Sequence, residues 1–244
     1  MTNKNNIIKI VKDQNESMVT VKNKLSSLPA RIIIVGKSAL SGKTNLLVNL
    51  LCNENPEFFL HNFEGENIYL VSGSIGTDDK LNKLILFKQI PDENLMLSFN
   101  EEAITNVYDE VEIKFKDNVI NKEKVNYLLI LDDMSFKGDL KKKTFGILNK
   151  IFSNGRHINL SIIVTAQKYS DLPTSFRENM TNLFSFNCSN KQLDLISDDV
   201  NYLENSKLFK SKFRKATAVP HSFFICNFFK SIDKMYLNSD LEYI

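Results

Sequence analysis

The sequence predicts an α/β fold with a mostly parallel central sheet flanked by helices. Short aliphatic runs such as Ile32–Val35 and Tyr127–Leu131 are apolar throughout, as expected of strands covered on both faces. Longer segments with apolar residues at helical spacing separate these runs. With 244 residues, of which 43% are hydrophobic, the chain is long enough to bury such a core.

The predicted elements alternate from Ala30 onward, which favours βαβ units. The predicted core strands are Ile32–Val35, Asn67–Ser72, Tyr127–Leu131, Leu160–Thr165 and Asn182–Phe186, with edge strands at Ser222–Phe229 and Met235–Leu237. The predicted helices are Thr44–Cys52, Glu101–Phe115 and Leu140–Phe152. The end of the second helix is open, because Val111, Ile113 and Phe115 also alternate as in a strand.

The ends of the chain differ in character from its middle. The first 28 residues are polar and rich in Lys and Asn, and only Ile7–Val11 and Met18–Val21 could form short strands or an arm. Lys207–Lys215 is a late lysine-rich stretch. We therefore divide the chain into an N-terminal appendage (1–28), a core (29–200) and a C-terminal basic segment with edge strands packed on that core (201–244).

Composition excludes several classes of protein. Three scattered cysteines without CxxC spacing argue against a disulfide framework or a zinc site and favour a reducing compartment. We expect no signal peptide and no transmembrane segment, because the start is polar and every apolar run is short. The net charge of +2 does not by itself indicate a nucleic-acid binder.

Arginine is rare in this lysine-rich chain. Only four of the 31 basic residues are arginines, namely Arg31, Arg156, Arg177 and Arg214. Each is a candidate for planar, bidentate hydrogen bonding, which lysine cannot provide. The alternative is that an arginine has no such role.

The stretch GKSALSGKT, residues 36–44, contains Gly-Lys-Ser/Thr twice, and a phosphate loop can use only one copy. The first copy would need its loop inside the strand, and it would leave Gly42 within a helix at a cost of about 1 kcal/mol. The second copy follows the strand and precedes the helix, as a phosphate loop requires. Its first glycine, Gly36, leaves five intervening residues instead of four. The predicted nucleotide-binding residues are Gly36, Lys37, Ser38, Ala39, Leu40, Ser41, Gly42, Lys43 and Thr44.

This loop predicts ATP and Mg²⁺ as ligands. Lys43 would reach the β- and γ-phosphates, and the Thr44 hydroxyl would ligate Mg²⁺. The strand YLLILDD ends in Asp132 and Asp133, two carboxylates that are costly there unless a cation or proton relieves them. Asp132 is the candidate magnesium ligand, and Asp133 the candidate general base for the attacking water.

Other nucleotide-dependent classes fit less well. Asn190–Asp194 (NKQLD) has one residue too many for a guanine-reading motif, and no DxxG follows the acidic strand. A transporter signature LSGGQ is absent, and the few arginines do not favour a small-molecule kinase with an arginine-rich lid. What remains is a P-loop ATPase of the additional-strand type, in which another strand lies between the loop strand and the acidic strand. The long separation of Lys43 and Asp132, which contains Asn67–Ser72, fits this type.

The stretch 154–186 narrows the class further. Its strand ends at Ala166-Gln167, with Gly155-Arg156-His157 before it and Arg177-Glu178-Asn179 after it. Together with GKTNLL and LLILDDM, this ordered set resembles the FtsK/HerA superfamily (RecA/FtsK-like fold), and most of all the genome-packaging ATPases of poxviruses, other large DNA viruses and virophages. The resemblance covers roughly residues 30–190, and the displaced Gly36 departs from the family pattern.

The resemblance implies roles for individual residues. Lys43, Thr44, Asp132 and Asp133 take the nucleotide, magnesium and acidic positions already described. Gln167 is the implied sensor of the γ-phosphate or of the attacking water. Arg156, eleven residues before Gln167, is the implied arginine finger acting on a neighbouring subunit. Arg177 is the alternative finger or a second sensor, and for either arginine a salt bridge at a helix end is the structural alternative.

The resemblance also implies a function. The expected protein is an ATP-driven translocase that packages viral double-stranded DNA into a capsid as a homo-oligomeric ring, expected to be a hexamer. Its partners would be DNA and capsid vertex proteins, without a membrane, in the host cytoplasm, the viral factory or the virion. The candidate DNA-binding residues, which a solvated lysine face would also explain, are Lys207, Lys210, Lys212, Arg214 and Lys215. A cellular or plasmid translocase of this superfamily, and a non-motor nucleotide switch, are the alternatives.

Overall fold

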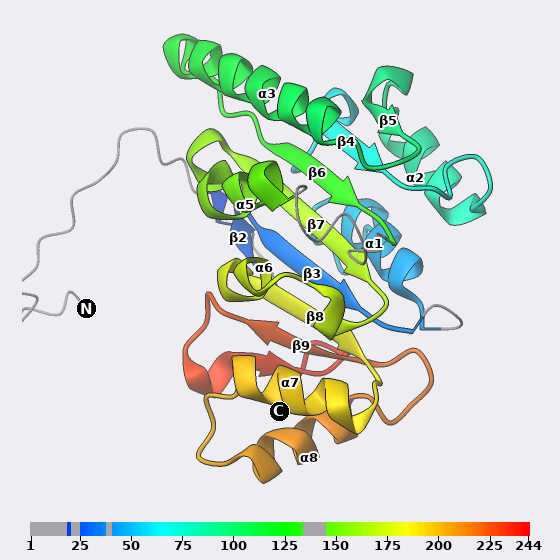
Figure 1. The fold of residues 1–244 in the computed structure, drawn as a ribbon, viewed down its shortest axis with the longest axis vertical. Helices are drawn as coiled ribbons and strands as arrows, with labels where there is room; N and C mark the ends of the chain where they lie inside the picture. Colours follow the sequence, from blue (N-terminus) through cyan, green and yellow to red (C-terminus); the bar gives the residue numbers. More distant parts are fainter. Residues whose placement is uncertain (1–18, 21–24, 38–40, 134–144) are drawn as a thin grey trace, which may run out of the picture.

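A computed structural model describes residues 19–20, 25–37, 41–133 and 145–244. It has an eight-stranded mixed sheet with helices on both faces (Figure 1). The strands of this sheet are β3 (Arg31–Val35), β4 (Ile68–Val71), β5 (Leu95–Met96), β6 (Tyr127–Leu131), β7 (Leu160–Ala166), β8 (Asn182–Phe186), β9 (Phe223–Asn227) and β10 (Tyr236–Leu237). A separate two-stranded sheet pairs β1 (Val19–Thr20) with β2 (Ser27–Leu28).

The helices alternate with these strands along the chain. They are α1 (Lys43–Cys52), α2 (Asp79–Lys88), α3 (Glu101–Asn121), α5 (Phe145–Asn154), α6 (Thr174–Asn179), α7 (Asn190–Val200) and α8 (Ser206–Ala216). The helix α3 continues to Asn121, so the helical alternative for residues 111–115 is correct. Three parts of the predicted elements lie outside the described residues: Ile7–Val11, the terminal residues Met18 and Val21 of Met18–Val21, and residues 140–144 of the third helix.

The strand order is β10-β9-β8-β3-β7-β6-β4-β5. The six strands from β8 to β5 run parallel, whereas β9 is antiparallel to both β8 and β10. The strand between the loop strand β3 and the acidic strand β6 is therefore β7. The strand β4, which occupies the long separation between Lys43 and Asp132, lies on the far side of β6.

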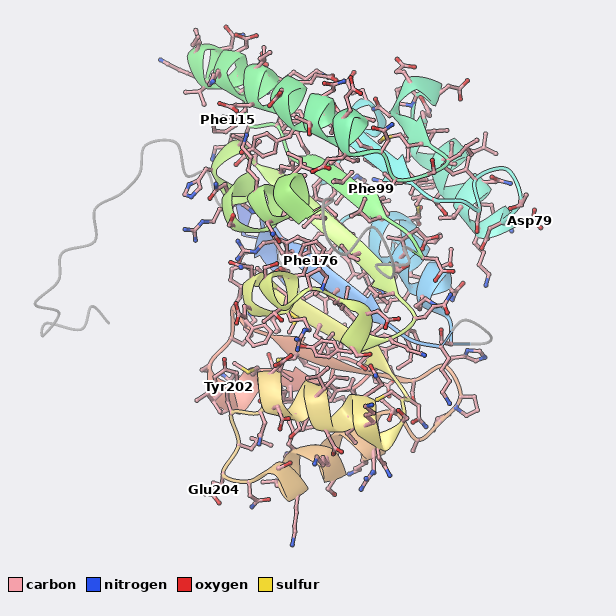
Figure 2. All side chains as sticks on the ribbon, viewed as in Figure 1. Asp79, Phe99, Phe115, Phe176, Tyr202 and Glu204 are labelled. Atoms are coloured by element: carbon pink, nitrogen blue, oxygen red, sulfur yellow. The ribbon has the colours of Figure 1, made fainter. Side chains whose placement is uncertain are left out.

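Each face of the sheet has its own apolar core because strand side chains alternate between the two faces. Ile33 and Val35 pack toward α3, α5, α6, α7 and α8. Ile32 and Ile34 pack toward α1 and α2. Phe176 of α6 stacks on Phe152 of α5 with ring centroids 4.1 Å apart, which joins the two helices above the first face (Figure 2).

Two boundary regions belong to these cores. Leu25 and Leu28, which the sequence prediction assigned to the appendage, are buried in the second core. Phe209 and Phe213 of the C-terminal segment are buried in the first core. No helix in the described part of the chain is both long enough and apolar enough to cross a membrane.

The parallel strands bring their carboxyl ends to one edge of the sheet, where the arrowheads of β3, β7 and β6 lie in Figure 1. Gly36 follows β3, Gln167 follows β7 and Asp132 follows β6. In open α/β sheets, ligands bind outside the carboxyl ends of the strands. The fold therefore gathers the predicted site at this edge.

Candidate active site

The phosphate loop connects β3 to α1. Gly42 adopts a left-handed conformation with φ 97° and precedes Lys43, the first residue of α1. Gly42, the N-cap residue, has no side chain to cap the amino end of α1, so among the described residues the first N–H groups of the helix are available to an anion. Ser41 Oγ and Lys43 Nζ both donate to the carbonyl oxygen of Lys37, at 2.7 and 3.2 Å. Ser38, Ala39 and Leu40 lie outside the described residues.

Packing explains the early position of the first glycine. A Cβ atom on Gly36 would lie 2.9 Å from Phe186 Cδ2 and 2.9 Å from Ser41 Cβ, closer than real Cβ contacts. The Gly36 N–H donates to the carbonyl oxygen of Ala166 at 3.1 Å, which ties the start of the loop to β7. A glycine is therefore required at position 36, directly after the strand.

Asp132 is a buried carboxylate held by two hydroxyl groups. Thr165 Oγ1 donates to Asp132 Oδ1 at 2.8 Å, and Ser72 Oγ donates to Asp132 Oδ2 at 3.1 Å. Burial raises the pKa of Asp132, and the hydrogen bonds from Thr165 and Ser72 oppose that rise. Ser72 and Thr165 belong to no motif and are not among the site residues predicted from the sequence. The feature that could have identified them is a hydroxyl side chain at the carboxyl end of a strand next to β6. Ser72 follows β4, and Thr165 lies near the end of β7.

Asp133 faces the phosphate loop from the end of β6. Its backbone is left-handed at φ 49°, and its N–H donates to Thr165 Oγ1 at 2.7 Å. Gln167 Nε2 donates to both carboxylate oxygens of Asp133 at 3.2 Å. Asp133 Oδ1 lies 4.0 Å from Lys43 Nζ, and the Asp133 side chain is 41% exposed. The predicted base, sensor and phosphate-binding lysine thus meet at one point.

Lys43 places a buried ammonium group in this cluster. Its side chain is only 7% exposed. Burial lowers the pKa of Lys43, and the charges of Asp133 and Asp132 act in the opposite direction. An anion such as a phosphate group that binds beside the Lys43 ammonium would stabilise its charged form, because charge interactions are stronger where water is largely excluded.

The oxygen donors of the site suit Mg²⁺. Asp132 and Thr44 supply a carboxylate and a hydroxyl, both hard oxygen ligands. Within the described ranges, no group of three or more His, Cys, Asp or Glu side chains could hold a metal by itself. In nucleotide sites, Mg²⁺ is usually held by one or two protein oxygens together with substrate phosphates.

Arg156 lies at the opposite edge of the sheet. It belongs to a 3₁₀ turn, Gly155–Ile158, that precedes the amino end of β7. The strand β7 is seven residues long, so about 20 Å separates this turn from the edge that carries Gln167. Arg156 is exposed, and its Nε–H donates to His157 Nε2 at 3.3 Å. This side chain cannot reach the phosphate loop of its own subunit.

Arg177 is bound within its own chain. It forms an ion pair with Asp199, and its Nη2 donates to Thr174 Oγ1 at 3.2 Å. Its guanidinium also lies 5.4 Å from the ring centroid of Tyr169. These contacts favour the structural alternative for Arg177.

The predicted basic cluster lies on α8. Lys210 pairs with Asp194 at 2.7 Å, and Arg214 Nη2 donates to Asn190 Oδ1 at 3.2 Å, so both side chains join α8 to α7. Lys207 and Lys215 are exposed, and Lys212 is half-buried. Phe209 and Phe213 are buried beneath the helix, whereas Leu208 is 41% exposed.

The loop at the end of β3, the acidic end of β6 and the intervening strand β7 define a P-loop NTPase of the additional-strand class. The chain belongs to the Poxvirus A32 protein family, which matches residues 18–218. The DNA packaging protein OPG160 of Variola virus and that of Vaccinia virus (strain Copenhagen) are each 30% identical to it over 154 residues. The matched region covers 58% of this chain and 53% of each relative, so the chain spans about half the length of the curated relatives it matches.

Solved structures share the fold. The genome packaging NTPase B204 from Sulfolobus turreted icosahedral virus 2, in complex with AMPPCP, superposes with a TM-score of 0.55 at 17% identity. This match covers 81% of our chain and 92% of B204. ATPases 2 and 3 of EssC from Geobacillus thermodenitrificans superpose with a TM-score of 0.53 at 14% identity, over 81% and 37% of the two chains.

Proposed function

We propose that this protein is an ATP-driven translocase that packages viral double-stranded DNA into a capsid. The observation that carries the proposal is the cluster of Lys43, Asp133 and Gln167 beside the buried Asp132. Membership of the Poxvirus A32 protein family supports the DNA substrate, because its relatives are named DNA packaging proteins. The class of B204, a genome packaging NTPase, agrees with this reading.

In the proposed reaction, water attacks the γ-phosphorus of ATP and ADP leaves with the bridging oxygen. Asp133 accepts the proton of the attacking water, and Gln167, which contacts Asp133, orients that water. Lys43 offsets the negative charge on the transferred phosphoryl group. A bound Mg²⁺ ion, held by Thr44 and Asp132, would neutralise charge on the β- and γ-phosphates.

The proposed active form is a homo-oligomeric ring, which we infer to be a hexamer. The support is the distance between the two edges of the sheet, because the exposed Arg156 can serve only the phosphate loop of a neighbouring copy. A ring gives every subunit such a neighbour. We further propose that capsid vertex proteins dock this ring, and that it acts in the host cytoplasm or viral factory and travels with the virion.

The proposed DNA contact is the exposed part of α8. Lys207, Lys212 and Lys215 would bind phosphates without reading bases, as a translocase must. Lys210 and Arg214 contribute less, because each already contacts α7.

The test is ATP turnover by the full chain with and without double-stranded DNA. We expect DNA to stimulate hydrolysis in the wild type, and expect Lys43→Ala and Asp133→Asn each to abolish it. The matched control is Asp198→Asn, an exposed aspartate on α7 away from the phosphate loop. Nucleotide binding without turnover under any DNA condition would refute the motor and leave a nucleotide switch.

A further inference from the structure

A large cavity opens beside the phosphate loop. Its volume is about 900 Å³, and it extends from Ser41–Thr44 along the outer surface of α1 to the C-terminal residues Ser239–Leu241. Such a volume matches pockets for small molecules and cofactors. Lys43 and Thr44 contribute to its lining, whereas Asp132, Asp133 and Gln167 do not, so the proposed hydrolysis leaves most of this cavity unused.

One wall of the cavity is aromatic. Phe186 of β8 and Phe223 of β9 contact each other edge to face, with ring centroids 5.4 Å apart, and both line the cavity. Phe186 also lies under the loop, because a Cβ on Gly42 would be 3.6 Å from its Cε1. A flat apolar ligand group would bury its surface against these rings while a phosphate chain attached to it bound at Lys43.

A tight turn formed by residues 238–242, which follows β10 next to β9, also contributes to the cavity wall. Asn238 Oδ1 accepts hydrogen bonds from the N–H groups of Asp240 and Glu242, at 3.0 and 2.9 Å. The N–H of Asn238 in turn donates to the carbonyl oxygen of Glu242 at 3.0 Å. Leu241 adopts a left-handed conformation with φ 62°, which completes the turn. Asn238 thus fixes the tip of the turn, Ser239–Leu241, at the rim of the cavity.

His221 also lines the cavity. A Cβ on Gly42 would lie 3.7 Å from His221 Nδ1, so the imidazole sits directly beside the phosphate loop. Like Leu241, His221 has a left-handed backbone, with φ 66°. The family match ends at residue 218, so His221 and the turn both lie beyond it.

We propose that this cavity binds the nucleoside part of the nucleotide, and that the turn 238–242 is its specificity wall. The inference rests on the proposed nucleotide-binding function. The base would stack on the aromatic wall, with its phosphates at Lys43. Asp240 would accept a hydrogen bond from a donor of the nucleoside, either a ribose hydroxyl or the exocyclic amine of adenine. An ionised carboxylate can accept hydrogen bonds but cannot donate them. A ligand that has no donor at this position therefore binds less well.

The experiment compares a nucleotide with a bare phosphate chain. Binding of magnesium adenylyl imidodiphosphate and of inorganic tripolyphosphate to the full chain is measured by calorimetry for the wild type, Asp240→Asn and Asn238→Ala. The control is Glu204→Gln, an exposed carboxylate on the loop between α7 and α8, which lies at the lower end of the view in Figure 2 and does not line the cavity.

We expect each turn variant to bind the nucleotide about tenfold more weakly, the usual loss for a hydrogen bond to a charged group. Tripolyphosphate affinity stays unchanged in both variants, and Glu204→Gln behaves like the wild type. Two further ligands identify the donor: 2′-deoxyadenosine triphosphate lacks the 2′-hydroxyl, and purine riboside triphosphate lacks the exocyclic amine. The affinity of the ligand that lacks the donor should not change on Asp240→Asn.

Equal nucleotide affinity in the wild type and both turn variants, with Lys43→Ala still abolishing binding, overturns the specificity wall and leaves the proposed function intact. Failure of the wild type to bind either ligand overturns the proposed function itself. Asp240→Asn changes one exposed side chain. It therefore decides the question even where Asn238→Ala lowers the Tm.

Discussion

Thr165 joins the two aspartates of the site through one hydroxyl group. That hydroxyl donates to Asp132 Oδ1 and accepts from the N–H of Asp133. Thr165 thereby fixes the orientation of a buried carboxylate and supports the left-handed backbone of Asp133. A partner that orients a metal-binding carboxylate typically matters almost as much as the ligand itself.

We predict that Thr165→Val lowers ATP turnover by about 10- to 100-fold, the usual cost of losing such a partner. It should also lower the free energy of unfolding by about 1–3 kcal/mol, because Asp132 and the Asp133 N–H lose their partner. Thr165→Ser keeps the hydroxyl and loses one methyl group, worth about 0.8 kcal/mol. Turnover assays and urea titrations measure both effects, and equal turnover in the two variants would contradict the role of the hydroxyl.

Sequence motifs pointed to residues on the loop and the acidic strand that lie together in the structure. Asp133 is close to Lys43 and contacts Gln167, while the roles assigned to these residues stay predictions. Ser72 and Thr165 were missed because their role depends on strand neighbours, and β4 and β7 flank β6 only once the strand order is known. The burial of Arg177 in an ion pair likewise depends on α7, whose Asp199 is distant in sequence.

At the level of the phosphate loop, the steric requirement at Gly36 gives a sharp prediction. Gly36→Ala places a Cβ within 2.9 Å of Phe186 and Ser41. The loop must shift, so we expect the free energy of unfolding to fall by about 1–3 kcal/mol. Nucleotide affinity should weaken by about tenfold or more as the loop moves.

Gly73→Ala is the matched control for this loop. A Cβ at Gly73 would lie 3.7 Å from the nearest atom, the carbonyl oxygen of Leu97, which is an ordinary van der Waals distance. Thermal unfolding and calorimetric nucleotide titrations of both variants decide the matter. An unchanged Gly36→Ala protein would show that the loop tolerates a side chain directly after β3.

The helix α8 carries the prediction about DNA. We expect the double variant Lys207→Glu, Lys215→Glu to weaken binding of double-stranded DNA at all sequences alike. The dependence of log K on log salt should become shallower by about 0.9 for each phosphate that the variant no longer neutralises. Filter binding over a salt series measures this slope. Lys124→Glu, an exposed lysine before β6, is the control, and an unchanged slope in the α8 variant would assign DNA binding to other elements.

The elements themselves were predictable where the sequence pattern was strong. All five predicted core strands exist, because continuous β-branched and aliphatic runs favour strands covered on both faces. The helices α2, α6, α7 and α8 were missed, although Leu193, Ile196 and Val200 of α7 are buried at helical spacing. In α8, lysines on the solvent face separate the buried residues Phe209, Phe213 and Ala216. The segment therefore appeared in the sequence as a basic cluster, and its helical spacing was not recognised.

The two edges of the sheet give the whole molecule its polarity. The phosphate loop, Asp133 and Gln167 lie at the carboxyl edge, and Arg156 lies at the amino edge. The half-buried Arg31, the first residue of β3, lies at the same edge, and burial and the charge of Arg156 both lower its pKa. An arginine that acts on the triphosphate of a neighbouring subunit must be exposed and must point away from the active site of its own chain. Arg156 meets both conditions.

We therefore predict that Arg156→Ala lowers ATP turnover by about 10³–10⁵, the usual contribution of an arginine supplied by a neighbour. Nucleotide affinity should stay near that of the wild type. Mixing Arg156→Ala with Lys43→Ala should restore part of the turnover, because some interfaces then combine an intact loop with an intact arginine. Turnover across mixing ratios, with assembly size from analytical ultracentrifugation, measures the effect.

Arg177→Ala separates the two arginines at the same scale. Its guanidinium is held by Asp199 and Thr174, so we expect this variant to lose about 1–3 kcal/mol of unfolding free energy. Turnover per folded molecule should persist. Each arginine variant is mixed with Lys43→Ala. If turnover returns with Arg177→Ala and not with Arg156→Ala, then Arg177 is the arginine that acts on the neighbouring subunit, because only a residue acting across an interface can be complemented by another copy.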